Sequence, residues 1–293
     1  MTAQDGPGPV RWTVAVSAAD RRRYSRRAPR ACMVSGAIVD LDGTVYRGDD
    51  LLPGAAAGVD TLREHGCGLC FFSNNPTKDG GAYVERLREL GVDAREGEAC
   101  SAGVATTRYL ADHHAEDPVL LVGDEGLAEQ LRAADVHLTD DPDEASVLLG
   151  SWTNEFDYYD MMAAMDAVDE DTVFLGSDPD RAIPYDDGRL IPGSGAIVGA
   201  LARTVGREPD RVLGKPSGVA RDLALDRLGL SAADAPDCLV VGDRLDTDLL
   251  LGERAGMTTV LVLSGVTDRA DLADSDIEPD YVLENLGEIE NVL

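Results

Sequence analysis

The chain is poor in positively charged residues, and lysine is almost missing from it. Its 293 residues include 26 lysines and arginines against 55 aspartates and glutamates, and the lysines are Lys78 and Lys215. The formal net charge of −29 argues against a partner that is a nucleic acid or an anionic membrane, because both require basic patches. An excess of carboxylates of this size is typical of a salt-adapted surface, where acids hold water and cations while salt screens their repulsion.

Long apolar runs and a disulfide framework are missing as well. No run approaches the roughly 18 to 20 apolar residues that a membrane helix needs, so we expect no membrane span. The five cysteines are an odd number scattered along the chain, which suits a reducing compartment and predicts a cytoplasmic protein. Cys67 and Cys70 have the CxxC spacing, but on an apolar strand they would point to opposite faces, which disfavours a shared metal.

The first 32 residues differ in charge from the rest, since they hold seven arginines and two aspartates. Together with the short apolar stretch that follows, they invite comparison with a twin-arginine export signal. The stretch is too short, has no small-residue cleavage site and runs straight into the first predicted strand. We therefore expect residues 1–32 to be a disordered basic tail or a mis-assigned start, with Met33 as the natural beginning.

From Gly36 onward, short apolar runs alternate with longer amphipathic ones, which predicts an α/β fold with a doubly wound parallel sheet. Residues 33–99 and 201–293 carry the main series, including a strand in "RVLGK" and another in "DCLVVGD". A second strand and helix series interrupts the first, and it predicts an inserted α/β cap at residues 100–200.

Polar residues follow the predicted strands of the main series, at the edge where parallel sheets bind ligands. These residues are Asp40, Asp42, Ser73, Asn74, Lys215 and Asp243. A solvated acidic surface would not place its acids at the mouths of buried strands. The sequence therefore predicts a functional site at this edge of the sheet.

At these positions the chain resembles the haloacid dehalogenase superfamily of aspartate-nucleophile phosphatases, with "DLDGT", "SNN", "GKP" and "GDRLDTD" as its four ordered motifs. The inserted segment, with "SDPDRAIP" and "IPGSGAIVGAL", is similar to that of subfamily IIA, which holds p-nitrophenylphosphatase, phosphoglycolate phosphatase, pyridoxal phosphatase and NagD-like enzymes. The resemblance covers Gly36 to about Val266. It implies a Rossmann-like core, a C2-type cap and hydrolysis of small phosphorylated metabolites.

The resemblance also implies a role for each motif residue. Asp40 would attack phosphorus and form an aspartyl phosphate, while Asp42 would protonate the leaving oxygen and then accept a proton from water. Mg²⁺ would bind Asp40, the backbone carbonyl of Asp42 and Asp243, with Asp248 supporting these ligands from behind. The phosphate-binding residues would be Ser73, Asn74 and Lys215.

The cap departs from the family pattern at one place. The expected Thr-Asn-Pro-Asp reads Ser177-Asp178-Pro179-Asp180, so Asp180 matches the substrate-facing acid while Asp178 replaces an amide. Salt adaptation and a change of substrate both explain that replacement. The resemblance further allows a homo-oligomer formed through the cap.

Two alternatives stay open on the sequence alone. The stretch "GSGAIVG" at Gly193–Gly199 has a glycine spacing near the dinucleotide fingerprint, although a proline interrupts the run before it. A phospho-accepting signalling receiver also combines an aspartate at a strand end with further acids and a lysine. A receiver would lack a large cap and would hold its phosphoryl group for long periods.

Overall fold

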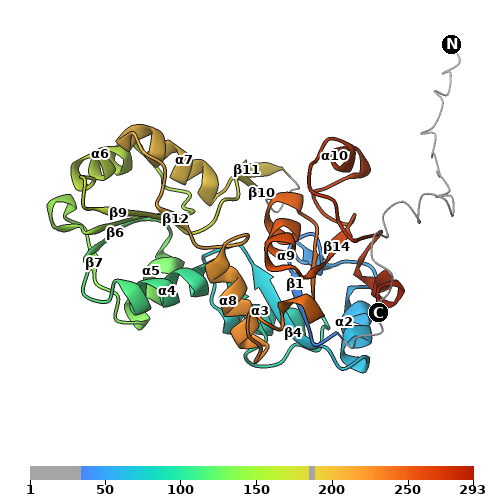
Figure 1. Cartoon of the computed structure of the whole chain (residues 1–293). Coiled ribbons are helices and arrows are strands. Elements are labelled where there is room, and N and C mark those ends of the chain that lie inside the picture. Colours follow the sequence, from blue (N-terminus) through green and yellow to red (C-terminus); the bar gives the residue numbers. More distant parts are fainter. Residues whose placement is uncertain (1–33, 185–188) are drawn as a thin grey trace, which may run out of the picture.

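Residues 34–184 and 189–293 are described by the structure, a computed structural model, and the predicted tail at 1–32 lies outside them. They form two α/β units next to each other, and the middle of the chain builds the second unit (Figure 1). Each unit has its own parallel sheet.

The first unit contains a six-stranded sheet of order β15-β14-β13-β1-β4-β5, in which every neighbouring pair is parallel. β1 lies between β13 and β4, so its carboxyl end meets strand ends from both halves of the chain. The strands are β1 (Gly36–Asp40), β4 (Gly68–Ser73), β5 (Ala99–Ser101), β13 (Cys238–Gly242), β14 (Thr258–Val262) and β15 (Tyr281–Leu283).

Apolar side chains cover both faces of this sheet. Val39 and Phe71 belong to a buried cluster on one face, while Ile38 and Phe72 belong to a second cluster on the other. A sheet that is buried on both faces confirms the predicted doubly wound α/β fold. The helices of this unit are α2 (Ala55–Glu64), α3 (Gly80–Glu89), α8 (Gly218–Arg227), α9 (Leu250–Ala255) and α10 (Arg269–Ala273).

The two cysteines of the CxxC spacing lie on opposite faces of the first sheet, as their spacing predicts. Cys67 packs in the cluster of Val39, whereas Cys70 packs in the cluster of Ile38. The near neighbour of Cys70 is instead Cys100, with 3.5 Å between the two sulfur atoms.

The second unit contains a five-stranded parallel sheet of order β12-β9-β8-β6-β7. Its strands are β6 (Val119–Val122), β7 (Leu138–Thr139), β8 (Val147–Gly150), β9 (Val173–Gly176) and β12 (Arg211–Val212). Its helices are α5 (Glu125–Ala133), α6 (Tyr158–Ala167) and α7 (Ser194–Val205). Helix α4 (Ala102–His113) joins the units, because Ala105 packs in the core of the first and Leu110 in the core of the second.

The strand predicted in "RVLGK" is not part of the first sheet. Arg211 and Val212 pair with Leu175 and Gly176 of β9, so β12 is an edge strand of the second sheet. This strand is only two residues long, and pairing across the sheet decides its place more than any local pattern does. The chain therefore stays with the second unit beyond the predicted boundary at residue 200.

Two short antiparallel hairpins flank the carboxyl edge of the first sheet. β2 (Tyr46–Arg47) and β3 (Asp50–Leu51) follow β1, and β10 (Ala182–Pro184) pairs with β11 (Leu190–Pro192) just before α7.

The glycine stretch at the start of α7 follows the β10–β11 hairpin and no buried parallel strand, so it lacks the context of a dinucleotide fingerprint. A Cβ atom at Gly195 would lie 2.2 Å from the carbonyl oxygen of Pro179. These glycines instead let α7 approach the backbone of the loop that carries Asp180.

Candidate active site

A buried lysine and three aspartates form the centre of the site. Lys215 Nζ donates to Oδ1 of Asp40 at 2.6 Å, to Oδ1 of Asp248 at 2.7 Å and to the carbonyl oxygen of Phe72 at 2.8 Å. All three of its N–H donors are therefore used. Asp40 is the last residue of β1, whereas Lys215 follows β12, so the ion pair joins the two units of the chain.

The carboxylates around Lys215 outweigh the cost of burying its charge. Burial by itself lowers the pKa of this ammonium, but Asp248 and Asp40 raise it by more, so Lys215 stays charged. The pKa of Asp40 is raised well above its ordinary value by burial and by the charge of Asp248, and Lys215 opposes both effects. One ammonium does not neutralise the acids that surround it.

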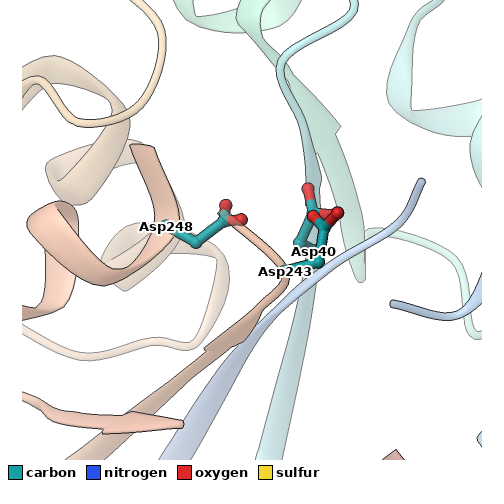
Figure 2. A group of neighbouring side chains, drawn as sticks. All are labelled: Asp40, Asp243 and Asp248. Carbon is teal, nitrogen blue, oxygen red and sulfur yellow. The ribbon is translucent and has the colours of Figure 1, made fainter. Parts of the chain in front are cut away.

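Asp243 completes the acidic cluster. Oxygens of Asp40, Asp243 and Asp248 lie within 4.8 Å of one another, and their carboxylates gather at the carboxyl ends of β1 and β13 (Figure 2). Burial and the neighbouring Asp248 raise the pKa of Asp243 to about 7. Oδ2 of Asp243 accepts a hydrogen bond from the backbone N–H of Val266 at 2.6 Å, while its buried Oδ1 has no hydrogen-bond partner among residues 34–184 and 189–293.

The glycine of "DLDGT" makes room for this cluster. Gly43 has a φ of +88°, a conformation that other residues rarely adopt. A Cβ atom at this position would lie 2.4 Å from Oδ2 of Asp243. The first motif therefore needs a glycine here both for its turn and for the approach of the fourth motif.

Asp42 lies just beyond the end of β1 and lines the same cavity as Asp40. Burial raises its pKa to about 6, although the cations Arg86, Lys78 and Arg244 pull it down. A carboxyl group with such a pKa can give up and take back a proton near neutral pH, which suits general acid and base work.

The predicted Ser73 is the last residue of β4, and Asn74 follows it at the same edge of the sheet. The Asn74 side chain accepts from the backbone N–H of Lys215 at 2.9 Å and donates to the Lys215 carbonyl at 3.1 Å and to Oδ1 of Asp180 at 3.2 Å. The sequence predicts a phosphate-binding role for the backbone amide of Asn74. The structure adds that its side chain ties the first unit to the second.

The predicted substrate-facing acid, Asp180, reaches the cavity from the second unit. Asp178 does not line it. The Asp178 carboxylate is 2% exposed and accepts from the Ser177 hydroxyl at 2.9 Å and from the backbone N–H of Asp180 at 3.2 Å. Burial and the charge of Asp180 raise the pKa of Asp178 to about 7. Asp178 thus shapes the loop that presents Asp180, and it is no solvated surface acid.

These side chains surround a cavity of about 80 Å³ at the boundary of the two units. The predicted residues that line it are Asp40, Asp42, Ser73, Asn74, Asp180 and Lys215. The cavity is also lined by five residues that were not predicted individually, namely Asn75, Ile183, Pro184, Arg244 and Thr247. Arg244 follows Asp243 directly in the fourth motif, so its position was a usable signal, but arginine is common in this chain.

A larger cavity of about 910 Å³ lies elsewhere, where the loop after β4 meets α4, α5 and α8. It contains none of the clustered aspartates, and basic Lys78, Arg108 and Arg227 share its walls with acidic Asp79 and Glu129. The pair of Asp40 and Lys215 therefore belongs to the smaller cavity.

The arrangement of charges on this fold indicates what kind of enzyme the protein is. The site of this α/β protein uses aspartates and a lysine at the carboxyl edge of a parallel sheet, with a second α/β unit over it. Such a charge arrangement is typical of enzymes that transfer phosphoryl groups, where neutralisation and positioning supply most of the catalysis.

Comparisons with known proteins agree with this class. Residues 37–137 match the family described as haloacid dehalogenase-like hydrolase, and residues 212–289 match a second model of HAD-hydrolase-like proteins. Acid sugar phosphatase of Staphylococcus haemolyticus is 34% identical over 86% of this chain and 93% of its own length. Sugar-phosphatase AraL of Bacillus subtilis is 30% identical over 87% of this chain and 92% of its own length.

A solved structure of p-nitrophenyl phosphatase from Archaeoglobus fulgidus superimposes with a TM-score of 0.80 and 39% identity, covering 88% of this chain and 99% of that one. The chain belongs to the haloacid dehalogenase-like hydrolases, in their subfamily IIA of phosphatases. The predicted family is therefore confirmed. The protein is a phosphatase, so the alternative of a phospho-accepting signalling receiver is set aside.

Proposed function

We propose that this phosphatase hydrolyses small phosphomonoesters through an aspartyl phosphate formed on Asp40, with Mg²⁺ as its cofactor. The observation that carries the proposal is the 2.6 Å contact between Lys215 Nζ and the Asp40 carboxylate at one wall of a small cavity. The positive charge of this fixed ammonium, beside the attacking oxygen, also attracts the negatively charged oxygens of the transferred phosphoryl group.

The proposed reaction has two displacements. An oxygen of Asp40 attacks phosphorus, the ester P–O bond breaks, and the leaving alcohol oxygen takes the proton of Asp42. Asp42, now a carboxylate, then removes a proton from water, and the resulting hydroxide attacks the phosphorus of the acyl phosphate. Inorganic phosphate leaves, and Asp40 returns as a free carboxylate. The pKa of about 6 at Asp42 suits both proton transfers.

The donor set fits a magnesium ion. Asp40 and Asp243 supply hard carboxylate oxygens, and the unpartnered Oδ1 of Asp243 is a buried acceptor that a cation would satisfy. The backbone carbonyl of Asp42 would add a third ligand, and Asp248, which pairs with Lys215, would support the site from behind. When bound, the ion neutralises negative charge on the phosphoryl oxygens.

Sugar phosphates are the substrate class that we propose first. Relatives at 34% and 30% identity are named acid sugar phosphatase and sugar-phosphatase, and they align over more than four fifths of this chain. Asp180 of the second unit lines the same cavity as Asp40 and Asp42, which supports a role in contacting the alcohol part of the ester. We therefore assign this unit the role of a substrate-selecting cap.

The cap also supports the proposed homo-oligomer. Helix α6 exposes Tyr158, Tyr159, Met162 and Met165 to solvent by 69%, 74%, 45% and 60%. Large apolar side chains gathered on one exposed helix are typical of a contact surface. Light scattering should give a mass above one chain for the wild type and a lower mass for Tyr159→Glu.

A reducing, cytoplasmic location and adaptation to salt remain part of the proposal. The cysteines that the structure describes are free and buried, and no helix within 34–184 and 189–293 could cross a membrane. The formal charge of −29 supports a surface that works in concentrated salt.

A phosphatase screen of the purified protein tests the proposed function. We expect Mg²⁺-dependent release of phosphate from p-nitrophenyl phosphate and from sugar phosphates at molar potassium chloride. Asp40→Asn should remove the activity, whereas Asp246→Asn, at an exposed position of the fourth motif, should keep it. Retained turnover in Asp40→Asn would overturn the assignment of the nucleophile.

A further inference from the structure

Arg244 extends from the first unit to the second across the active site. Its backbone N–H donates to Oδ2 of Asp248 at 3.2 Å, which fixes the start of the side chain next to the aspartate cluster. Its Nη2 atom donates to the carbonyl oxygen of Ala182 at 3.1 Å, in strand β10. This strand begins two residues after Asp180, so Arg244 touches the hairpin that follows the substrate-facing acid.

Arg244 and Asp180 both line the 80 Å³ cavity. Asp180 is among the charges that raise the pKa of Arg244 against the effect of burial, so the two groups are close enough to interact. Arginine has five N–H donors, and the contact with Ala182 is the side-chain hydrogen bond that Arg244 makes to the described residues. The cavity thus offers strong donors next to a strong acceptor.

We infer that Arg244 and Asp180 together recognise hydroxyl groups on the alcohol part of the ester, and that Arg244 is therefore a specificity-determining residue. This inference rests on the proposed function, and it narrows the substrate class to phosphorylated polyols and sugars. Ile183 and Pro184 give the same cavity an apolar wall for the carbon skeleton.

Hydroxyl groups fit this pair because each can donate to Asp180 and accept from Arg244. A carboxylate on the alcohol part could accept from Arg244, but it would find no donor in Asp180 and would be repelled by the charge of Asp180. A plain alkyl group would leave both charged side chains without partners, and a site that binds hydroxyls rejects an analogue without them. The pair therefore favours polyol esters over alkyl and carboxylate-bearing esters.

Two matched substrates test the inference, since glycerol 1-phosphate and propyl phosphate differ only in hydroxyl groups. We expect the wild-type enzyme to prefer glycerol 1-phosphate by at least about tenfold in kcat/KM, with phosphoglycolate disfavoured as well. Arg244→Gln should reduce this preference to about twofold or less, mainly by raising KM for glycerol 1-phosphate. Arg244→Lys should recover part of the preference because it restores a positive donor.

Arg254→Gln is the matched control, because Arg254 donates to the carbonyl oxygen of Pro216 at 3.2 Å from an exposed position outside the cavity. It should keep the wild-type preference. Equal losses on both substrates in Arg244→Gln would show that Arg244 only holds the two units together, and would overturn the inference. Failure of the proposed function is distinguishable, because then the wild-type enzyme hydrolyses neither substrate.

Discussion

Nζ of Lys215 lies 2.6 Å from Oδ1 of Asp40, although 175 positions of sequence separate the two residues. Asp40 ends the central strand of the first sheet, whereas Lys215 follows the edge strand of the second. The Asn74 side chain strengthens this junction, since it binds the Lys215 backbone and Asp180. The chemistry therefore depends on how the two units meet as well as on the first sheet.

Asp42→Asn should cost most on substrates with poor leaving groups. Alkyl phosphates need their leaving oxygen protonated, so we expect kcat to fall by about 10²- to 10⁴-fold for them. The loss on p-nitrophenyl phosphate should be clearly smaller, because nitrophenolate leaves without a proton. Asp50→Asn, at an exposed acid of the next hairpin, is the control. Equal losses on both kinds of substrate would count against an acid role for Asp42.

Asp243→Asn should weaken magnesium binding before any substrate is present. A cation that binds only the folded protein raises its melting temperature, and this effect needs no catalysis to be seen. We expect Mg²⁺ to stabilise the wild type and Asp246→Asn, and to shift Asp243→Asn much less. In the absence of metal at pH 8, Asp243→Asn should have a higher melting temperature than the wild type, because burial of the ionised Asp243 carboxylate destabilises the wild-type fold. A full Mg²⁺ shift in Asp243→Asn would contradict the proposed ligand set.

Asp178 should make stability fall as the pH rises. Its pKa is about 7 in the folded protein against an ordinary value of 3.8, so the folded state binds this proton more tightly. The contribution of protonated Asp178 to the free energy of unfolding is therefore fully present below about pH 4, and it is lost as the pH rises through 7. As the pH rises from 4 to 8, the free energy of unfolding of Asp178→Asn should therefore increase by up to about 4 kcal/mol relative to that of the wild type.

Urea unfolding at several pH values measures the free energy of unfolding of Asp178→Asn and of the wild type. The other buried aspartates titrate in both proteins, so the difference in the free energy of unfolding isolates Asp178 and its coupling to Asp180. The amide can keep both contacts, because the Ser177 hydroxyl both accepts and donates. A difference that does not change with pH would show that Asp178 is already ionised in the folded protein.

Potassium chloride should stabilise the fold over a wide range of concentration. A formal charge of −29 repels itself most at low ionic strength, where the Debye length is long. We expect the melting temperature to rise steadily from about 0.1 M toward molar salt. A melting temperature indifferent to potassium chloride would contradict the proposed adaptation to salt.

Local patterns predict the first sheet and the positions of several candidate site residues at its carboxyl edge, because buried parallel strands are continuous apolar runs and their carboxyl ends share one edge. Asp40, Ser73 and Asp243 fall at such ends in the structure. Lys215 was predicted at the site by its motif, but the strand before it belongs to the other sheet. A two-residue edge strand has too little sequence to reveal its partner.

Contacts between the units lie beyond such patterns. Arg244 reaches Ala182 across 62 positions, and Asn74 reaches Asp180 across 106. Nothing in the local sequence indicates which side chains will meet when one unit packs over the other. The buried position of Asp178 was hidden for the same reason, since an acid in this chain is most often at the surface.

Trapping the phosphorylated enzyme is the sharpest test of the proposed aspartyl phosphate at Asp40. A substrate with a radiolabelled phosphoryl group is mixed with enzyme and Mg²⁺, quenched in acid within one turnover, and the protein is digested and mapped. We expect label on the peptide that contains Asp40, sensitive to hydroxylamine as acyl phosphates are, and no label in Asp40→Asn. Substrate consumed without label on that peptide, or label on another residue, would contradict an aspartyl phosphate at Asp40.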